Sequence, residues 1–303
     1  MKITYRPAEE QDLAGAHLAL VEALNQSARE RNQPSLEIDF QDALPLWQHL
    51  LGTSEGGFWV AEAKDRMAGF ACGIPRERLW YLSYLVVHPE YQGQGIARDL
   101  LARVLEGSYR GQVEVRAAYA DTANWISVSL YARHGLFPRV PILHLQGSIS
   151  EMSPLGEEQA QPEFEVARLS EDTLTALGDL DQEIRAVRRE VDHRFWLGMR
   201  GLRAYLFSRA GNPVAYAYLS DDGTMGPIAT LRREDIRPIL NFALERLSDQ
   251  GVDRFTARVP GLNTEAISFL YERGFTLQEM SLILSSQPFG RWENYIVSQA
   301  SLL

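Results

Sequence analysis

Apolar positions in the first half of the chain switch repeatedly between the period of a helix and that of a strand. The run from 8 to 26 places four apolar residues on one helical stripe, namely Leu13, Ala16, Leu20 and Leu24. Residues 80–87 are aromatic or aliphatic at all but one position, which predicts a strand buried on both faces of a sheet. Further strands are predicted at 2–6, 58–63, 67–74, 112–119 and 140–149, and helices at 96–107 and 124–135. We therefore predict an α/β unit with a mixed sheet flanked by helices.

The second half repeats this order of elements. Residues 124–135 and 263–274 both run from a helix-capping asparagine to a glycine, and they lie 139 positions apart, close to half the chain. Between the halves, 150–163 lacks apolar periodicity and carries two prolines and four glutamates. We therefore predict a catalytic domain at 1–149, a linker at 150–163 and a second domain at 164–303. In the second domain, one long helical region is expected to end near Gly198.

Composition and charge exclude several classes of protein. The longest stretch without a charged residue is about a dozen residues, fewer than the ~18 apolar positions of a membrane span, so no membrane partner is expected. The net charge of −10 disfavours a nucleic-acid partner. The N-terminal segment lacks the apolar stretch of a secretory signal, which predicts a cytoplasmic protein. The single Cys72 is expected to pack as a small apolar residue, and the histidine spacing predicts no metal site.

The strongest local signal lies between the strand at 80–87 and the helix that starts near 96. Gly93 and Gly95 allow a tight turn that brings backbone amides close to a ligand, and the helix start adds its positive dipole end. This combination predicts a site for an anion such as a phosphate. Arg98 stands where a dinucleotide site needs a third glycine, and a P-loop ending is absent. The alternative is that both glycines only make a tight connection.

This segment resembles the signature of the GNAT superfamily of acyl-CoA-dependent N-acyltransferases. The family pattern Arg/Gln-x-x-Gly-x-Gly/Ala is met by Gln92, Gly95 and Ala97, and Asn124 and Tyr131 match two residues of the family's next helix. With the internal repeat, the chain resembles tandem GNAT proteins, an arrangement that mycothiol synthases share. The resemblance implies that acetyl-CoA contacts Leu85, Val86, Val87, Gln92, Gly93, Gln94, Gly95, Ile96, Ala97, Arg98 and Asn124.

The resemblance also implies an activity, the transfer of acetyl from acetyl-CoA to a primary amine by direct attack. Tyr131 would protonate the departing thiolate, and its alternative role is that of a packed helix tyrosine. The base stays unassigned, because the strand at 80–87 has no carboxylate; the candidates are Tyr84, His88 and a water chain to a more distant acid. The acceptor is expected to be a small molecule and the protein a monomer or homodimer. The alternatives are a non-catalytic acyl-CoA sensor or scaffold and a mycothiol-synthase-like acetyltransferase.

The second half lacks the glycine turn. A gap-free offset of 139 residues places Leu231, Glu234 and Ile236 opposite the three residues of the pattern, and a register anchored on Pro227 supplies no glycine either. Acidic side chains at this helix start would repel a pyrophosphate. Leu270 stands opposite Tyr131. We therefore expect the second domain to be catalytically degenerate.

Overall fold

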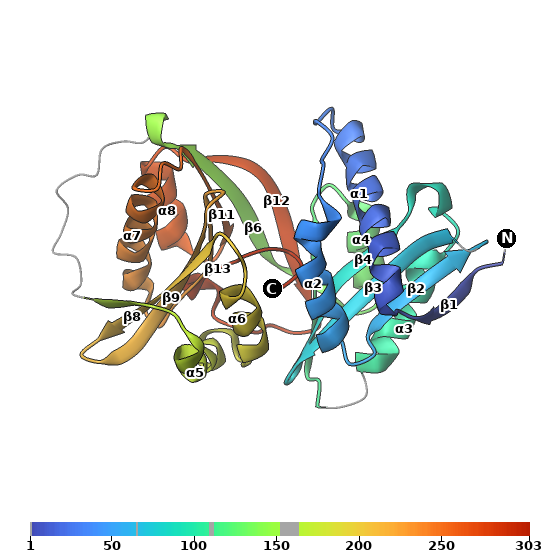
Figure 1. Ribbon diagram of the computed structural model, residues 1–303, viewed down its shortest axis with the longest axis horizontal. Coiled ribbons are helices and arrows are strands. Elements are labelled where there is room, and N and C mark those ends of the chain that lie inside the picture. The colour runs from blue at the N-terminus through green and yellow to red at the C-terminus, as the bar shows by residue number, and fades with distance from the viewer. Residues whose placement is uncertain (1, 65, 109–111, 152–163) are drawn as a thin grey trace. The chain divides into compact units, whose positions relative to one another are not determined.

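A computed structural model describes residues 2–64, 66–108, 112–151 and 164–303 (Figure 1). The chain divides into two compact units, Met1–Ala118 and Tyr119–Leu303. The helices are α1 (Leu13–Glu30), α2 (Phe40–Thr53), α3 (Ile96–Ser108), α4 (Trp125–Arg133), α5 (Leu174–Arg185), α6 (Glu190–Leu197), α7 (Ile236–Ser248) and α8 (Thr264–Glu272). The strands are β1 (Thr4–Pro7), β2 (Phe58–Ala63), β3 (Arg66–Arg76), β4 (Leu79–Val87), β5 (Val115–Asp121), β6 (Phe137–Ser148), β7 (Glu165–Arg168), β8 (Leu202–Arg209), β9 (Asn212–Ser220), β10 (Thr224–Thr230), β11 (Arg254–Pro260), β12 (Thr276–Ser285) and β13 (Tyr295–Ile296).

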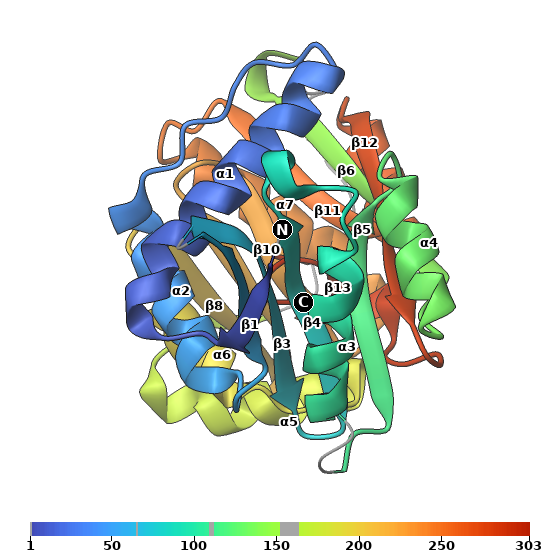
Figure 2. The same ribbon diagram turned by 90° about the vertical axis from the view of Figure 1, so that its right-hand side faces the viewer.

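In the first unit, helices cover both faces of a mixed sheet. The strand order is β1-β2-β3-β4-β5, with antiparallel neighbours except for the parallel pair β4 and β5. Trp47 of α2 packs against Phe70 of β3 at a ring-centroid distance of 5.5 Å. The adjacent Gly69 points the other way, because a Cβ there would lie 3.5 Å from a methyl group of Ile96 on α3. Thus α2 and α3 lie on opposite faces of this sheet (Figure 2).

The second unit is built on a larger sheet with the order β12-β6-β11-β10-β9-β8-β7, and β13 pairs with β10. The only parallel pair among the described registers of this unit is β10 with β11. Strand β6 comes from the first half of the sequence, yet it lies between β11 and β12 and pairs antiparallel with both. The last strand that we predicted for the first domain is therefore part of the sheet of the second unit.

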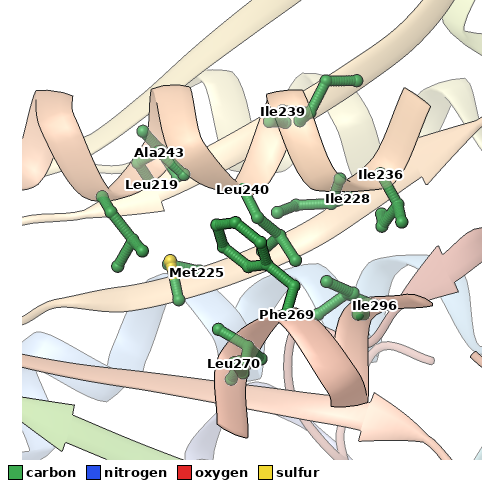
Figure 3. Packing of buried hydrophobic residues seen from close by; sticks show 14 of the residues in the cluster. Leu219, Met225, Ile228, Ile236, Ile239, Leu240, Ala243, Phe269, Leu270 and Ile296 are labelled. Carbon is green, nitrogen blue, oxygen red and sulfur yellow. The ribbon is translucent and has the colours of Figure 1, made fainter. Parts of the chain in front are cut away.

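The main core of the second unit lies between this sheet and the helices α7 and α8. Figure 3 shows Leu240 of α7 and Phe269 of α8 beside Ile296 of β13, all of which are buried. Leu145 of β6 belongs to the same core. Because side chains alternate along a strand, the neighbouring residues of β6 point to the other face. On that face of β9, Tyr218 stacks on His193 of α6.

The two halves share their order of elements, as the sequence repeat predicted. Each has the series strand, helix, helix, three strands, helix, strand, helix, strand. Asn124 and Asn263 cap α4 and α8, accepting hydrogen bonds from backbone amides three residues on at 3.0 and 3.1 Å. Gly135 and Gly274 close the same helices with φ of 79° and 85°. The fold is a tandem α/β fold with mixed sheets flanked by helices, which confirms the predicted class.

Several details differ from the sequence-based expectations. The predicted long helical region ends at Ala186, which has a φ of 64°, and α6 then starts as a separate helix. Helix α2 was not predicted, and Leu24 is exposed although its stripe suggested burial. Most of the predicted linker at 150–163 lies outside the described residues. The domain limits at 149 and 163 stay a prediction. None of the described helices is long and apolar enough to cross a membrane.

Candidate active site

The connection between β4 and α3 is an exposed turn with two glycines in the left-handed region. Gly93 and Gly95 have φ of 76° and 82°, a conformation that disfavours side chains. A Cβ on Gly93 would meet no atom within 4 Å, so the turn is open on that side. Sequence patterning predicted this conformation because only glycine adopts it at little cost.

The turn presents backbone donors at the start of a helix. Among the described residues, the amides of Gly93, Gln94 and Gly95 have no hydrogen-bond acceptor. Arg98 lies over the turn, with Nη2 3.4 Å from the position that a Cβ on Gly95 would take. Consecutive free amides, a guanidinium and the positive end of a helix dipole together suit an anion. The residues present therefore fit a pyrophosphate group.

The side chain of Gln92 links the glycine turn to β4 and α1 by hydrogen bonds. Its Nε2 donates to the backbone oxygen of Val87 at 3.2 Å and to Oε1 of Gln26 on α1 at 3.0 Å. The side chain thus joins the turn to the end of β4 and to a helix on the same unit. We infer that Gln92 holds the turn in shape and leaves the backbone amides to meet a ligand.

Strand β4 continues past its pairing with β5. The described β4–β5 register runs from Leu79↔Val115 to Leu82↔Ala118, while Leu85–Val87 pair with β3 on the other side. The last part of β4 therefore has a described strand partner on one side. Its backbone leads directly into the glycine turn.

The two side chains predicted as candidate bases, His88 and Tyr84, are both engaged in other contacts. His88 accepts a hydrogen bond at Nδ1 from the amide of Glu90 at 3.2 Å, and its Nε2 forms an ion pair with Glu22 of α1. Both ring nitrogens are therefore engaged. Tyr84 stacks on Trp47 at a ring-centroid distance of 5.2 Å and belongs to an aromatic cluster.

Asn124 and Tyr131 lie in the other compact unit, where they share α4. Asn124 is exposed and acts as the N-cap of the helix. Tyr131 is buried, with 5% of its surface exposed. Burial raises the pKa of Tyr131 well above its usual value of 10, and a hydrogen bond with Ser127 opposes this shift. The phenol therefore carries its proton at neutral pH.

In the second half, the chain itself fills the space beside the corresponding strand. Pairing of β10 with β11 ends at Met225↔Ala257, and Ala257 lies 139 positions after Ala118. Beyond this point β13 pairs with β10 and its next residue, Val297, bridges to β11. Gly226 permits this approach, because a Cβ there would lie 2.6 Å from the backbone oxygen of Val297.

A buried polar network fixes β13 in this place. Arg185 and Arg189 donate to the hydroxyl of Tyr295 at 3.1 and 2.6 Å. Asp181 accepts from Nε of Arg189 at 2.5 Å and from the Tyr216 hydroxyl at 2.5 Å. All five side chains are buried. Patterning did not predict this network, because its members come from α5, β9, β13 and the segment before α6.

The glycine turn of the first half has no counterpart in the second. Eight residues separate β4 from α3, whereas five separate β10 from α7. The gap-free register that placed Leu231, Glu234 and Ile236 opposite the motif was therefore wrong, because three residues are missing. Asp235 is buried and pairs with Arg209 at 2.7 Å, so its charge is compensated within the fold.

Comparison with known proteins agrees with this geometry. Residues 19–136 match the model of the acetyltransferase (GNAT) family, and these limits enclose β4, the glycine turn and α4. Over this stretch the chain is similar to acetyltransferases of the GNAT family. The glycine turn, with the pattern residues Gln92, Gly95 and Ala97, lies inside this stretch. No curated protein matches the chain.

Solved structures extend the likeness over the whole chain. An acetyltransferase candidate from Pyrococcus horikoshii has a TM-score of 0.76 at 14% identity, over 99% of this chain and 95% of its own. A GCN5-related N-acetyltransferase from Sphaerobacter thermophilus has a TM-score of 0.63 at 15% identity, over 95% and 96%. A tandem GNAT protein from the clavulanic acid biosynthesis pathway has a TM-score of 0.60 at 15% identity, over 95% and 99%. At these identities the likeness shows the tandem GNAT fold. Among the described residues, no group of three or more histidine, cysteine or acidic side chains could hold a metal.

Proposed function

We propose that the protein transfers an acetyl group from acetyl-CoA to the primary amine of a small molecule, using the glycine turn of its GNAT domain. The observation that carries the proposal is the open turn at Gly93 and Gly95, with unpaired amides at the start of α3. Phosphate recognition at such a turn depends on close backbone approach and on the helix dipole together. Both features are present here.

Each part of the site has a task in this reaction. The amides of Gly93–Gly95 and the Arg98 guanidinium would bind the pyrophosphate, and the backbone at Leu85–Val87 would align the pantetheine arm as an added strand. Acetyl-CoA supplies the acetyl group as a thioester. An N–H at the end of β4 would stabilise the charge that develops on the carbonyl oxygen. Tyr131, which keeps its proton at neutral pH, would give that proton to the departing thiolate.

The second half of the chain lacks the features of an acetyl-CoA site, which favours one site in each chain. Its β10–α7 connection is too short for the glycine turn, and β13 pairs with β10 where an added strand would otherwise lie. Leu270, at the position of Tyr131, is part of the hydrophobic core and cannot give a proton (Figure 3). We propose that the second domain has a structural role.

The test is the substitution Gly95→Glu, which adds bulk and negative charge where the phosphates would lie. We expect it to abolish saturable binding of acetyl-CoA in calorimetric titration. Gly251→Glu is the matched control, because Gly251 also has a positive φ of 78° and open space around it. It should bind acetyl-CoA as the wild type does. Wild-type affinity in Gly95→Glu would show that the turn is only a connection.

A turnover assay with acetyl-CoA and a panel of amines distinguishes an acetyltransferase from a non-catalytic acyl-CoA sensor. Release of the CoA thiol can be followed with a thiol reagent while ethanolamine, spermidine, glucosamine and lysine are supplied in turn. Burial raises the pKa of the Cys72 thiol well above its usual range, so this cysteine should add little to the signal. Binding of acetyl-CoA without thiol release for any amine would favour a non-catalytic sensor.

A further inference from the structure

Within the first unit, two side chains of α1 contact the connection between β4 and α3. Glu22 of α1 forms an ion pair with Nε2 of His88, the first residue after β4. About one helical turn further along α1, Oε1 of Gln26 accepts a hydrogen bond from Nε2 of Gln92 at 3.0 Å. Residues four positions apart project from the same face of a helix. Helix α1 therefore holds this connection at two points, one on each side of the short segment before the glycines.

His88 is buried and uses every polar group that it has. Its backbone amide donates to the oxygen of Ala68 on β3 at 3.0 Å, and its backbone oxygen accepts from the amide of Tyr91 at 2.9 Å. Its ring caps the short 3₁₀-helix Pro89–Tyr91, because Nδ1 accepts from the amide of Glu90 at 3.2 Å. The ion pair with α1 engages Nε2. His88 thus fixes the path by which the chain leaves β4 and enters the glycine turn.

The partners of His88 decide which ring nitrogen carries the proton. Nδ1 accepts from an amide N–H and therefore keeps its lone pair, while Nε2 carries a proton that it donates to the Glu22 carboxylate. This Nε2–H form satisfies both contacts at once. A proton on Nδ1 would instead point at the amide of Glu90. Glu22 thereby holds the ring in the tautomer and orientation that cap the turn.

The position of Glu22 is unfavourable if charge alone is considered. In the proposed function, the amides of Gly93–Gly95 and the Arg98 guanidinium would bind a pyrophosphate, and a carboxylate close to this turn would repel it. By Coulomb's law, loss of Glu22 should therefore strengthen the binding of acetyl-CoA. A role in holding His88 predicts the opposite sign, because the turn would lose its support. The sign of the effect thus separates the two roles.

We propose that Glu22 and His88 are positioning residues, which hold the glycine turn in the shape that binds the pyrophosphate of acetyl-CoA. The proposal rests on the proposed function. Glycine loses more backbone freedom on ordering than any other residue, so a turn with Gly93 and Gly95 is costly to fix at the moment of binding. A capped turn that is tied to α1 is ordered before the ligand arrives, and binding then costs less.

The two contacts with α1 differ in strength. The hydrogen bond between Gln26 and Gln92 joins neutral groups and is exposed, so water can replace either partner. The contact between Glu22 and His88 includes a carboxylate, and the His88 side chain is only 9% exposed. We therefore expect Gln26→Ala to weaken the binding of acetyl-CoA less than Glu22→Ala does.

The first test is calorimetric titration of acetyl-CoA into variants of the two residues. Glu22→Ala and His88→Ala should each weaken binding by roughly 3- to 30-fold, the range expected for loss of a capping side chain. Glu22→Gln should restore most of the affinity, because its amide oxygen can accept the same hydrogen bond. His88→Asn should restore part of it, since asparagine can cap a helix start. The double variant of Glu22→Ala and His88→Ala should lose no more than His88→Ala alone, because the two residues act through one contact.

Two controls separate positioning from charge and from a damaged fold. Glu90→Ala removes a carboxylate that is 62% exposed in the same connection and pairs with the exposed Arg66 at 3.4 Å. It should bind acetyl-CoA at least as tightly as the wild type. With a panel amine that gives turnover, Glu22→Ala should raise KM for acetyl-CoA and leave kcat at saturation unchanged. A damaged fold would lower kcat as well.

The outcomes distinguish this proposal from the proposed function. Saturable binding by the wild type, with equal or tighter binding by Glu22→Ala, would overturn the positioning role and leave the acetyl-CoA site standing. Equal losses in Glu22→Ala and Glu90→Ala would overturn it too, because the effect would not be specific to the contact with His88. Absence of saturable binding by the wild type would count against the proposed function itself.

A second readout needs neither ligand nor turnover. Nitrogen-15 NMR of histidine-labelled protein reports which ring nitrogen of His88 carries the proton, and the loss of one signal in His88→Asn assigns the resonance. We expect the Nε2–H form in the wild type. A proton on Nδ1 would overturn the proposal, because the ring could not then accept from the amide of Glu90.

Discussion

Tyr131 combines two properties that a general acid needs, a retained proton and a fixed position. Burial holds the pKa of the Tyr131 phenol above 10. The end of α4 fixes the backbone of this residue, because the amide of Leu136 donates to the backbone oxygen of Tyr131 at 3.0 Å. A phenol on a capped helix loses little entropy when it meets a leaving group. These are properties of one residue in its place on a helix.

We predict that Tyr131→Phe lowers kcat by roughly 10² to 10⁴, because the thiolate then leaves without a proton donor. The affinity for acetyl-CoA should stay within a few fold of the wild type. Steady-state kinetics and calorimetry measure the two quantities. Tyr271→Phe is the matched control, since Tyr271 is 46% exposed on the corresponding helix α8. An unchanged kcat under conditions where chemistry limits the rate would remove Tyr131 from the mechanism.

At the scale of elements, the two halves use one fold in two ways. In the first half, β4 runs into an open glycine turn. In the second half, β13 pairs with β10 through Ile228↔Ile296 and Ala229↔Tyr295, and the side chain of Ile296 is part of the hydrophobic core. A strand that satisfies backbone groups and buries apolar surface is costly to displace.

We therefore predict that one acetyl-CoA binds to each chain. Isothermal titration of the wild type gives the stoichiometry, and Gly95→Glu should reduce it from one to zero. Two sites per chain would contradict this prediction. Saturable binding that survives in Gly95→Glu would contradict it as well, since the second half would then hold a site despite β13.

At the scale of the whole molecule, stability depends on a charged network that is excluded from water. Burial would raise the pKa of Asp181, but the charges of Arg189 and Arg185 and a hydrogen bond with His193 outweigh it and hold that pKa well below its usual range. Burial is the main cause that lowers the pKa of His193, so this imidazole is neutral in the folded protein. Both groups bind protons more readily in the unfolded chain.

The sign of the pH dependence follows from these directions. As the pH falls below about 6.5, the unfolded chain takes up a proton at His193 that the folded protein resists, so the free energy of unfolding decreases. Below about pH 4 the same holds for Asp181. We predict a slope of up to about 1.4 kcal/mol per pH unit for each proton, measured by urea unfolding from pH 7.5 downward. His193→Gln should remove the first part of this slope, and parallel curves for the two proteins would show that His193 does not contribute.

The sequence by itself determined the features that depend on neighbours along the chain. The strand at 80–87, the glycine turn and the helix caps at Asn124 and Asn263 are fixed by local periodicity and by the conformations that glycine and asparagine allow. These features were enough to predict the tandem fold, and they carry the resemblance to the GNAT superfamily. The repeat also followed, because the caps and the closing glycines recur at one offset.

Only the tertiary structure decided which strands pair and which polar side chains meet. Periodicity gives β6 the same pattern whether it pairs within the first half or with β11 and β12, because only the alternation of buried and exposed positions is encoded locally. Strand β13 carries too few residues to show a period at all. Tyr119, His144 and Glu279 are separated by up to 160 positions, and no local spacing connects them. They come together because neighbouring strands place residues of the same face a few ångströms apart, so this hydrogen-bonded group is a property of the folded sheet.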